Sequence, residues 1–292
     1  MKRIHLKPQD PCWCGSGHLY SECHQPLDQK IAYYKKRGHI VPSHSLIRTP
    51  AEIAGIQASA DINTVVLDAV AAAICEGMST EEIDKIVYDT TTARGAICAP
   101  LNYEGYPKSV CTSVNNEVCH GIPSHRRKLK AGDIVNVDVS TIYNGFYSDA
   151  SRMFMIGEVS DENRRLVEET KECLNRAIAA AQAWHFVGDI GAAVQSYAES
   201  CGYSVVRELG GHGVGLKFHD DPFVSHIGKK NTGMLLVPGM VMTVEPMINM
   251  GSARVEMDRY NGWTIYTQDG KPSAQWEHTI LITEDGPQIL TY

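Results

Sequence analysis

Hydrophobic residues in the first half of the chain recur at the spacing of helices. A Thr-Pro-x-Glu capping box at residues 49–52 opens a stretch in which apolar positions keep this spacing to Gly77. Ser79 and Glu82 cap a second stretch of the same kind, which runs to about Gly95. The pattern therefore predicts two consecutive helices.

The second half repeats this order. Ser160 opens a helical pattern that lasts to about Trp184, and Asp189 begins another that stops at Gly202. Four strand-like runs follow: YSVVREL at 203–209, MVMTVEPMI at 240–248, GWTIYTQDG at 262–270 and AQWEHTILIT at 274–283. Two helix-helix-strand halves in one body predict a pseudo-symmetric α+β fold, with the strands forming a central curved sheet.

Between the two helical regions, residues 133–154 (DIVNVDVSTIYNGFYSDASRMF) alternate as a strand hairpin does. An Asn-Gly turn at 144–145 pairs Asp138 with Ser151, which leaves Asp138 and Asp149 on one face. Two carboxylates this close repel unless one is protonated or a cation lies between them. A solvated polar face is the alternative explanation.

The composition is that of an ordinary globular protein. The start of the chain lacks an apolar signal region, and no stretch approaches the length of about eighteen uncharged apolar residues that a membrane span needs. Nine cysteines without an export signal favour free thiols and a metal site over a disulfide framework. We therefore expect a cytoplasmic protein without a membrane anchor.

Charge is unevenly distributed along the chain. Residues 1–48 hold 8 Lys and Arg against 3 Asp and Glu, a charge of +5, whereas the remainder holds 19 against 31 and carries −12. The basic segment is compatible with a polyanionic partner, although lysines on a helix face are more often only solvated.

The basic head contains a compact set of four potential zinc ligands. In PCWCGSGHLYSECH, at residues 11–24, three thiols and an imidazole match the preference of structural zinc, and so short a segment needs a metal to fold. The spacing resembles the SEC-C zinc motif, with the ligands Cys12, Cys14, Cys23 and His24. A loop with incidental cysteines is the alternative. We expect a zinc-binding head and linker at residues 1–44 and a separate body at 45–292.

Further acids and a histidine in the second half lie where an unpaired charge is costly. Glu245 and Glu277 fall inside apolar, strand-like runs, and His212 lies among the glycines of GGHGVGLKFHDDP. Each residue taken alone is more readily explained as structural. Together with Asp138 and Asp149, however, they form an oxygen-rich set with one nitrogen donor, which suits two divalent ions better than a closed zinc site.

The segments that carry these residues are similar to the signature blocks of type I methionine aminopeptidases. They are NYEGYPKSVCTSVNNEVCHGIP, DVSTIYNGFYSDASRMF, GGHGVGLKFHDDP, VMTVEPMI and GWTIYTQDGKPSAQWEHTI. The similarity spans residues 45–292, and the ordered series Asp, Asp, His, Glu, Glu is highly specific. The resemblance implies the pita-bread fold of the aminopeptidase/creatinase type, which agrees with the two-halves pattern.

By this resemblance, two divalent ions (Co, Mn, Fe or Zn) share the site. Asp149 and Glu277 bridge the ions, Asp138 chelates one of them, and His212 with Glu245 completes the other. A water that bridges the two ions has a lowered pKa and attacks the peptide carbonyl. Glu245 also serves as a proton carrier.

The resemblance also implies a methionine pocket and two further histidines. His120 and His219 contact substrate, stabilise the tetrahedral intermediate and orient the scissile amide. The residues that would line an apolar, polarisable cleft for the thioether are Tyr103, Tyr106, Cys111, Phe218 and Trp263, together with His120 and His219. Asp220 stands where most relatives have Glu, and the shorter acid does not remove a ligand.

The implied activity is removal of the N-terminal methionine from nascent proteins and peptides, with a small second residue preferred. The fold is complete without a partner, so we expect a monomer. The basic head then becomes a candidate contact with the ribosome, whose RNA is polyanionic.

Three other functions are compatible with parts of the pattern. A proline-directed peptidase uses a similar metal quintet but usually carries a larger N-terminal domain. A noncatalytic binding protein of the same fold would lack metal ligands. A nucleic-acid adaptor would rely on the zinc head and have an inert body.

Overall fold

The computed structural model describes residues 6–292, so the first five residues of the predicted head lie outside the described part. The helices are α1 (Gln25–Lys36), α2 (Pro50–Ala73), α3 (Thr80–Thr92), α4 (Asp161–Ala180) and α5 (Val187–Ser200), with short 3-10 turns at Tyr20–Glu22, His44–Leu46 and Tyr103–Gly105. Within residues 6–292, none of these helices combines the length and the apolar character that crossing a membrane requires.

The strands are short except for two that form the predicted hairpin. They are β1 (Ile97–Cys98), β2 (Cys111–Val114), β3 (Glu117–Cys119), β4 (Ile134–Tyr143), β5 (Phe146–Met155), β6 (Ser204–Val205), β7 (Gly211–Gly213), β8 (Asp220–Val224), β9 (Val241–Val244), β10 (Met247–Asn249), β11 (Val255–Met257), β12 (Ile265–Thr267), β13 (Ser273–Gln275), β14 (His278–Thr283) and β15 (Gly286–Ile289).

The predicted capping boxes form at the starts of α2 and α3. The Glu52 N–H donates to the Thr49 hydroxyl (3.3 Å), and the Thr49 N–H donates to the Glu52 carboxylate (2.7 Å). Ser79 and Glu82 exchange the same pair of bonds. These bonds satisfy N–H groups that have no partner inside the helix, so both helices begin where the sequence predicts.

Other helix boundaries differ from the prediction. α2 and α4 each end four residues early, at Ala73 and Ala180, because the backbone leaves the helical conformation directly after them. α5 begins at Val187 rather than at Asp189, whose carboxylate accepts a hydrogen bond from the Phe186 N–H (2.8 Å). Asp189 therefore caps this helix from inside its first turn.

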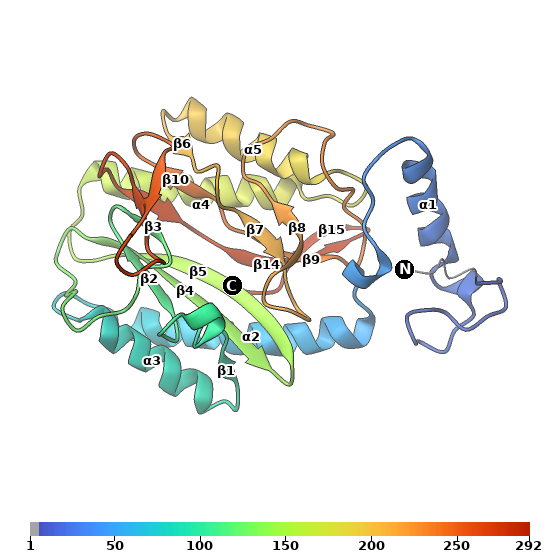
Figure 1. Cartoon of the computed structure of the whole chain (residues 1–292), viewed down its shortest axis with the longest axis horizontal. Helices are drawn as coiled ribbons and strands as arrows, with labels where there is room; N and C mark the ends of the chain where they lie inside the picture. The colour runs from blue at the N-terminus through green and yellow to red at the C-terminus, as the bar shows by residue number, and fades with distance from the viewer. Residues whose placement is uncertain (1–5) are drawn as a thin grey trace.

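The strands pair in four ladders that together make the central sheet structure. In the first half, the strand order is β1-β4-β2, and β5 also pairs with β4. In the second half, the strand order is β15-β14-β9-β7-β8. Two three-stranded ladders, β13-β10-β6 and β11-β12-β3, lie beside them. In Figure 1, the strands lie between α2 and α3 on one side and α4 and α5 on the other. The predicted α+β architecture with two helix-helix-strand halves is confirmed.

Each half has its own hydrophobic core. α2 and α3 bury Leu67 and Ile83 in one cluster with Val137 of β4. α4 and α5 bury Leu174 and Ile190 in a second cluster with strands of the second half. Because the helices cover the outer faces of the strands, the inner faces of the two halves meet each other.

The zinc-motif head packs against the body through α1. Tyr34 stacks on Trp184 with ring centroids 6.1 Å apart, and the Lys30 ammonium lies 3.8 Å from the centre of the same indole. Asp28 accepts hydrogen bonds from three side chains of the head and linker, those of Trp13, Tyr20 and His44. The contacts with Trp184 place α1 beside the second half (Figure 1), whereas the Asp28 bonds hold the head and linker together.

Replacing Thr49 by Ala should lower the free energy of unfolding by about 1 kcal/mol, because the first N–H groups of α2 lose their acceptor. Equilibrium unfolding in urea, followed by tryptophan fluorescence, measures the change. Thr49→Ser keeps the hydroxyl and serves as the matched control. An Ala variant that unfolds at the wild-type urea concentration would contradict the role of the cap.

Candidate metal centre

The hairpin of β4 and β5 places two aspartates on one face, as predicted. Asp138 pairs with Ser151, and Ser140 pairs with Asp149, which confirms the register expected from the Asn-Gly turn. The Ser140 hydroxyl donates a hydrogen bond to Asp149 Oδ1 (2.8 Å). The two carboxylates therefore come from neighbouring strands of the first half and face the second half.

Glu245 and Glu277 lie between strands, which corrects the prediction that placed them inside strand-like runs. β9 pairs with β14 in one ladder, whereas β10 pairs with β13 in another. Glu245 occupies the break between β9 and β10, and Glu277 occupies the break between β13 and β14. The segments β9–β10 and β13–β14 therefore run side by side and change pairing at the same place. Each glutamate lies at this place. A single bridge links Glu277 to Ser151 of β5 and joins the halves there.

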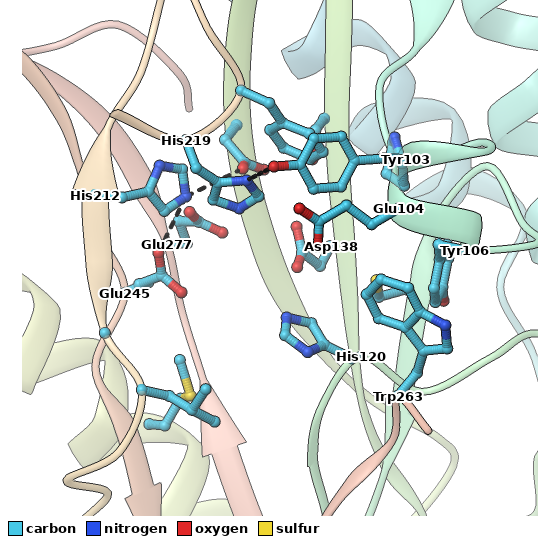
Figure 2. Close-up of a pocket in the computed structure, with 18 of the residues that line it drawn as sticks. Tyr103, Glu104, Tyr106, His120, Asp138, His212, His219, Glu245, Trp263 and Glu277 are labelled. Atoms are coloured by element: carbon cyan, nitrogen blue, oxygen red, sulfur yellow. Dashed lines mark hydrogen bonds and ion pairs between the residues drawn. The ribbon is translucent and has the colours of Figure 1, made fainter. Parts of the chain in front are cut away.

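The five predicted ligands meet at this point. His212 Nε2 lies 3.7 Å from Asp149 Oδ2 and 3.7 Å from Glu245 Oε1. Ligand atoms of Asp149, His212 and Glu277 all lie within 4.8 Å of one another. Figure 2 shows Asp138 directed into the same space, between the histidine and glutamates on one side and aromatic residues on the other.

Neighbouring groups orient the candidate ligands. Thr243 Oγ1 donates to Glu245 Oε1 (2.7 Å), and Gln275 Nε2 donates to Glu245 Oε2 (3.1 Å). His212 Nδ1 lies 3.0 Å from the Gly213 carbonyl oxygen, to which it donates. The Nε2 lone pair of His212 is then free to bind a metal, the arrangement typical of ligating histidines.

Burial and mutual repulsion make the carboxylates hard to ionise without a cation. Burial raises the pKa of Asp138 to about 7 and that of Glu245 to about 8. The pKa values of Asp149 and Glu277 lie well above their usual range because of burial and of the neighbouring carboxylates. Among the described residues, buried Asp138 Oδ1 has no hydrogen-bond partner.

This donor set fits divalent metal ions. Four buried carboxylates with raised pKa values, one of which offers an unpartnered oxygen, need positive charge to be stable in the ionised form. Burial lowers the pKa of His212 to about 3, so its imidazole is neutral at pH 7, the form that binds metals. Oxygen-rich donors with one nitrogen suit manganese, iron, cobalt or zinc.

A cavity of about 400 Å³ opens beside the carboxylates. All five candidate ligands line it, and so do the seven residues that the resemblance implies for substrate binding, Tyr103, Tyr106, Cys111, His120, Phe218, His219 and Trp263. Tyr106 is fixed by its hydroxyl, which donates to the carbonyls of Val110 (3.1 Å) and Gly121 (3.0 Å). The structure thus brings every candidate of the body into one site.

Several lining residues are not among the candidates from the sequence. They are Pro100, Glu104, Ser140, Glu208, Leu209, Gly210, Phe223 and Met247. Ser140 carries a signal, since it alternates with Asp138 on the same strand face. The carboxylate of Glu104 reaches the cavity (Figure 2) because the backbone at this residue is left-handed (φ +49°). No periodic pattern in the sequence predicts such a conformation, so the sequence gives no sign of Glu104 as a site residue.

A second group of potential metal ligands lies in the head. The side-chain donor atoms of Cys12, Cys14, Cys23 and His24 all lie within 4.8 Å of one another. Cys14 Sγ is 3.7 Å from Cys23 Sγ, and His24 Nδ1 is 3.2 Å from Cys12 Sγ and 3.1 Å from Cys23 Sγ. Tetrahedral zinc holds such atoms roughly 3.5–3.8 Å apart. The spacing of Cys14 and Cys23 matches this range and those of His24 are somewhat shorter, so a small adjustment would let this closed set hold a structural zinc ion.

Family profiles match both parts of the chain that carry these groups. The profile described as metallopeptidase family M24 matches residues 54–284, and the profile of the SEC-C motif matches residues 10–26. A relative named methionine aminopeptidase, from Chlamydia pneumoniae, is 42% identical over 290 residues, which cover 98% of this chain and 99% of the relative. That similarity therefore includes the head.

Solved structures give the same result for the body. The crystal structure of methionine aminopeptidase from Rickettsia prowazekii superimposes with a TM-score of 0.83 at 42% identity, covering 84% of this chain and 99% of that one. A Xaa-Pro dipeptidase from Bacillus anthracis shares the fold, with a TM-score of 0.69 at 24% identity, but this chain covers only 62% of it. The expected pita-bread fold is confirmed.

The stability of the metal-free protein should fall as the pH rises. The raised pKa values mean that folded Asp138 and Glu245 hold protons that the unfolded chain has released. Their contribution is present below the unfolded pKa of about 4 and is lost as the pH rises through about 7 to 8. Urea unfolding of chelator-treated protein at about pH 5 and pH 8 should show this loss, on the order of 1 kcal/mol per unit of pKa shift.

Glu277→Gln should raise the stability of the metal-free protein at about pH 8, because one of the repelling charges is removed. Glu256→Gln, at an exposed position, is the matched control and should leave the unfolding curve unchanged. A metal-free protein equally stable at both pH values would show that the carboxylates are not strained by burial.

Proposed function

The chain belongs to metallopeptidase family M24, and we propose that it uses this centre to remove the N-terminal methionine from peptides and nascent proteins. One observation carries the proposal: the candidate metal ligands and the implied methionine pocket line a single cavity. The chain is a metal-dependent hydrolase, and its substrate is a free N-terminus that can enter this cavity.

Two divalent ions would be held by five residues, with Asp149 and Glu277 between the ions. Asp138 would help to hold one ion, and His212 with Glu245 would hold the other. When bound, the ions supply Lewis-acid activation of a water molecule and of the scissile carbonyl.

Glu245 is the proton carrier of this site. Thr243 and Gln275 each donate to one of its carboxylate oxygens and so fix its orientation. Without a bound ion, burial raises the pKa of Glu245 to about 8. This oriented carboxylate takes up a proton from the attacking water and passes it to the leaving amine.

Two neutral histidines orient the scissile peptide from opposite sides. Burial lowers the pKa of His120 to about 4 and also lowers that of His219. His219 Nδ1 lies 3.0 Å from the Tyr103 hydroxyl, and when that hydroxyl donates, the ring proton of His219 is on Nε2. His219 Nε2–H can then donate to the carbonyl oxygen, and His120 faces it across the cavity (Figure 2).

Aromatic rings and a thiol form the methionine pocket. Tyr106 meets Trp263 edge to face with ring centroids 5.2 Å apart, and Tyr103 meets Phe218 in the same way at 4.8 Å. Burial raises the pKa of the Cys111 thiol well above its usual range, so it stays uncharged. A thioether side chain is well suited to such polarisable walls.

The head at residues 1–44 would act as a separate module on the catalytic body at 45–292. Its four ligands leave no open position for substrate, so a zinc ion there serves structure alone. Lys30, Lys35, Lys36 and Arg37 give α1 and its end a basic surface. We propose that this head binds ribosomal RNA, and that the protein acts as a cytoplasmic monomer.

Peptides with a small second residue should be hydrolysed at least about tenfold faster than those with a bulky one, because the resemblance to methionine aminopeptidases implies a site that excludes a bulky second side chain. Release of methionine from Met-Ala-Ser and Met-Leu-Ser measures the ratio, and chelation should abolish both reactions until divalent metal is restored. Equal turnover of the two peptides would contradict the size restriction and leave the peptidase activity standing.

Deletion of residues 1–40 should leave hydrolysis of Met-Ala-Ser intact but reduce cosedimentation with ribosomes, an effect that weakens as salt increases. The full chain carrying Cys12→Ser and Cys14→Ser is the matched control, since it keeps the basic charge but loses zinc. If full-length and deleted proteins sediment equally at every salt concentration, the head does not tether the enzyme.

A further inference from the structure

Arg48 is a buried arginine beside the active site. It lies just before α2, it is 4% exposed, and its N–H donates to the Gly239 carbonyl (2.8 Å). Its guanidinium donates from Nη1 to the Ser45 carbonyl (2.6 Å) and from Nη2 to Asp220 Oδ2 (3.4 Å). The side chain therefore runs from the linker to the loop that carries His219.

A buried guanidinium is costly unless a carboxylate compensates it. Within residues 6–292, Asp220 is the carboxylate at ion-pair distance from Arg48, and its side chain is only 15% exposed. Removing either partner leaves the other buried without its counter-charge. This pair therefore fixes the position of Asp220 more strongly than a surface ion pair would.

The Asp220 carboxylate organises the loop on its other side as well. Its Oδ1 accepts a hydrogen bond from the Asp221 N–H (3.0 Å) and pairs with Lys217 Nζ (3.2 Å). In the ladder, Asp220 is the partner of Gly213, the residue that follows His212. Through Asp220, Arg48 is thus linked to the backbone next to His219 and, across the strand pair, to the residue next to His212.

His219 directly precedes Asp220 and is held at its ring by aromatic neighbours. The imidazole stacks on Phe218 with centroids 4.4 Å apart, lies 4.3 Å from the His212 ring, and contacts the Tyr103 hydroxyl through Nδ1 at 3.0 Å. These contacts restrain the ring, whereas the backbone beneath it is restrained by Asp220. A shift of Asp220 would move His219 relative to the substrate carbonyl.

We propose that Arg48 is a positioning residue for hydrolysis, acting on His219 through Asp220. The proposal rests on the substrate contact proposed for His219. The proposal also gives Asp220 a physical role, because the buried guanidinium reaches this carboxylate and holds it.

Steady-state hydrolysis of Met-Ala-Ser at saturating metal tests this role. Arg48→Met should lower kcat by about 10- to 100-fold, because a displacement of about 1 Å at the reacting groups has an effect of this size. KM should change by less than about twofold and the bound metal should be unchanged, since the metal ligands are untouched. Arg48→Lys, which keeps the charge, should restore most of kcat.

The double variant Arg48→Met/His219→Ala identifies the route of the effect. If Arg48 acts through His219, the Met substitution should lower kcat by less than about twofold once His219 is already Ala. Asp220→Asn, at a less buried position, should reproduce the loss seen in Arg48→Met. Arg176→Met removes an exposed ion pair on α4 and is the matched control with wild-type kcat.

Three outcomes would overturn the proposal. An Arg48→Met enzyme with wild-type kcat removes the role, and so does an equal fold-loss of kcat with and without His219. A soluble Asp220→Asn variant with wild-type kcat excludes the route through that carboxylate. An inactive wild-type enzyme contradicts the proposed function itself, which distinguishes that failure from the loss of the Arg48 role alone.

Discussion

The burial of four carboxylates at one point between two halves is the constraint on which the structure depends. Burial opposes the ionisation of each of these acids, and neighbouring carboxylates add to the effect at Asp149, Glu245 and Glu277. Folding of the chain therefore concentrates negative charge in a place that water does not stabilise. The free energy stored in this arrangement becomes binding free energy for cations, since cations relieve the repulsion.

Other features of the body follow from this concentration of charge. The two chain segments that cross between ladders do so side by side, and each break carries one glutamate into the space between the halves. Thr243 and Gln275 satisfy the carboxylate oxygens of Glu245, and the carbonyl of Gly213 fixes the tautomer of His212. The strands that end at these breaks therefore position the two glutamates and also carry Thr243 and Gln275, which orient Glu245.

The sequence predicted the structural features that depend on interactions between residues close together in the chain. Capping boxes located the starts of α2 and α3, and the Asn-Gly turn determined the register that puts Asp138 and Asp149 on one face. Pro246 directly after Glu245 was a signal against one continuous strand, whereas at Glu277 only pairing with different partners interrupts the strand, which the sequence does not show. Nor could the contact of Arg48 with Asp220, which joins positions 172 residues apart.

The ligand set also constrains when an enzyme molecule becomes active. Its members are spread from Asp138 in the first half to Glu277 in the second, and neither half holds a complete set. During translation, earlier segments fold before later ones have been made. Until the second half has been made, the first half carries only Asp138 and Asp149 of the proposed ligands and cannot support the proposed reaction. Each copy of this enzyme can process other nascent chains only after its own residue 277 has left the ribosome.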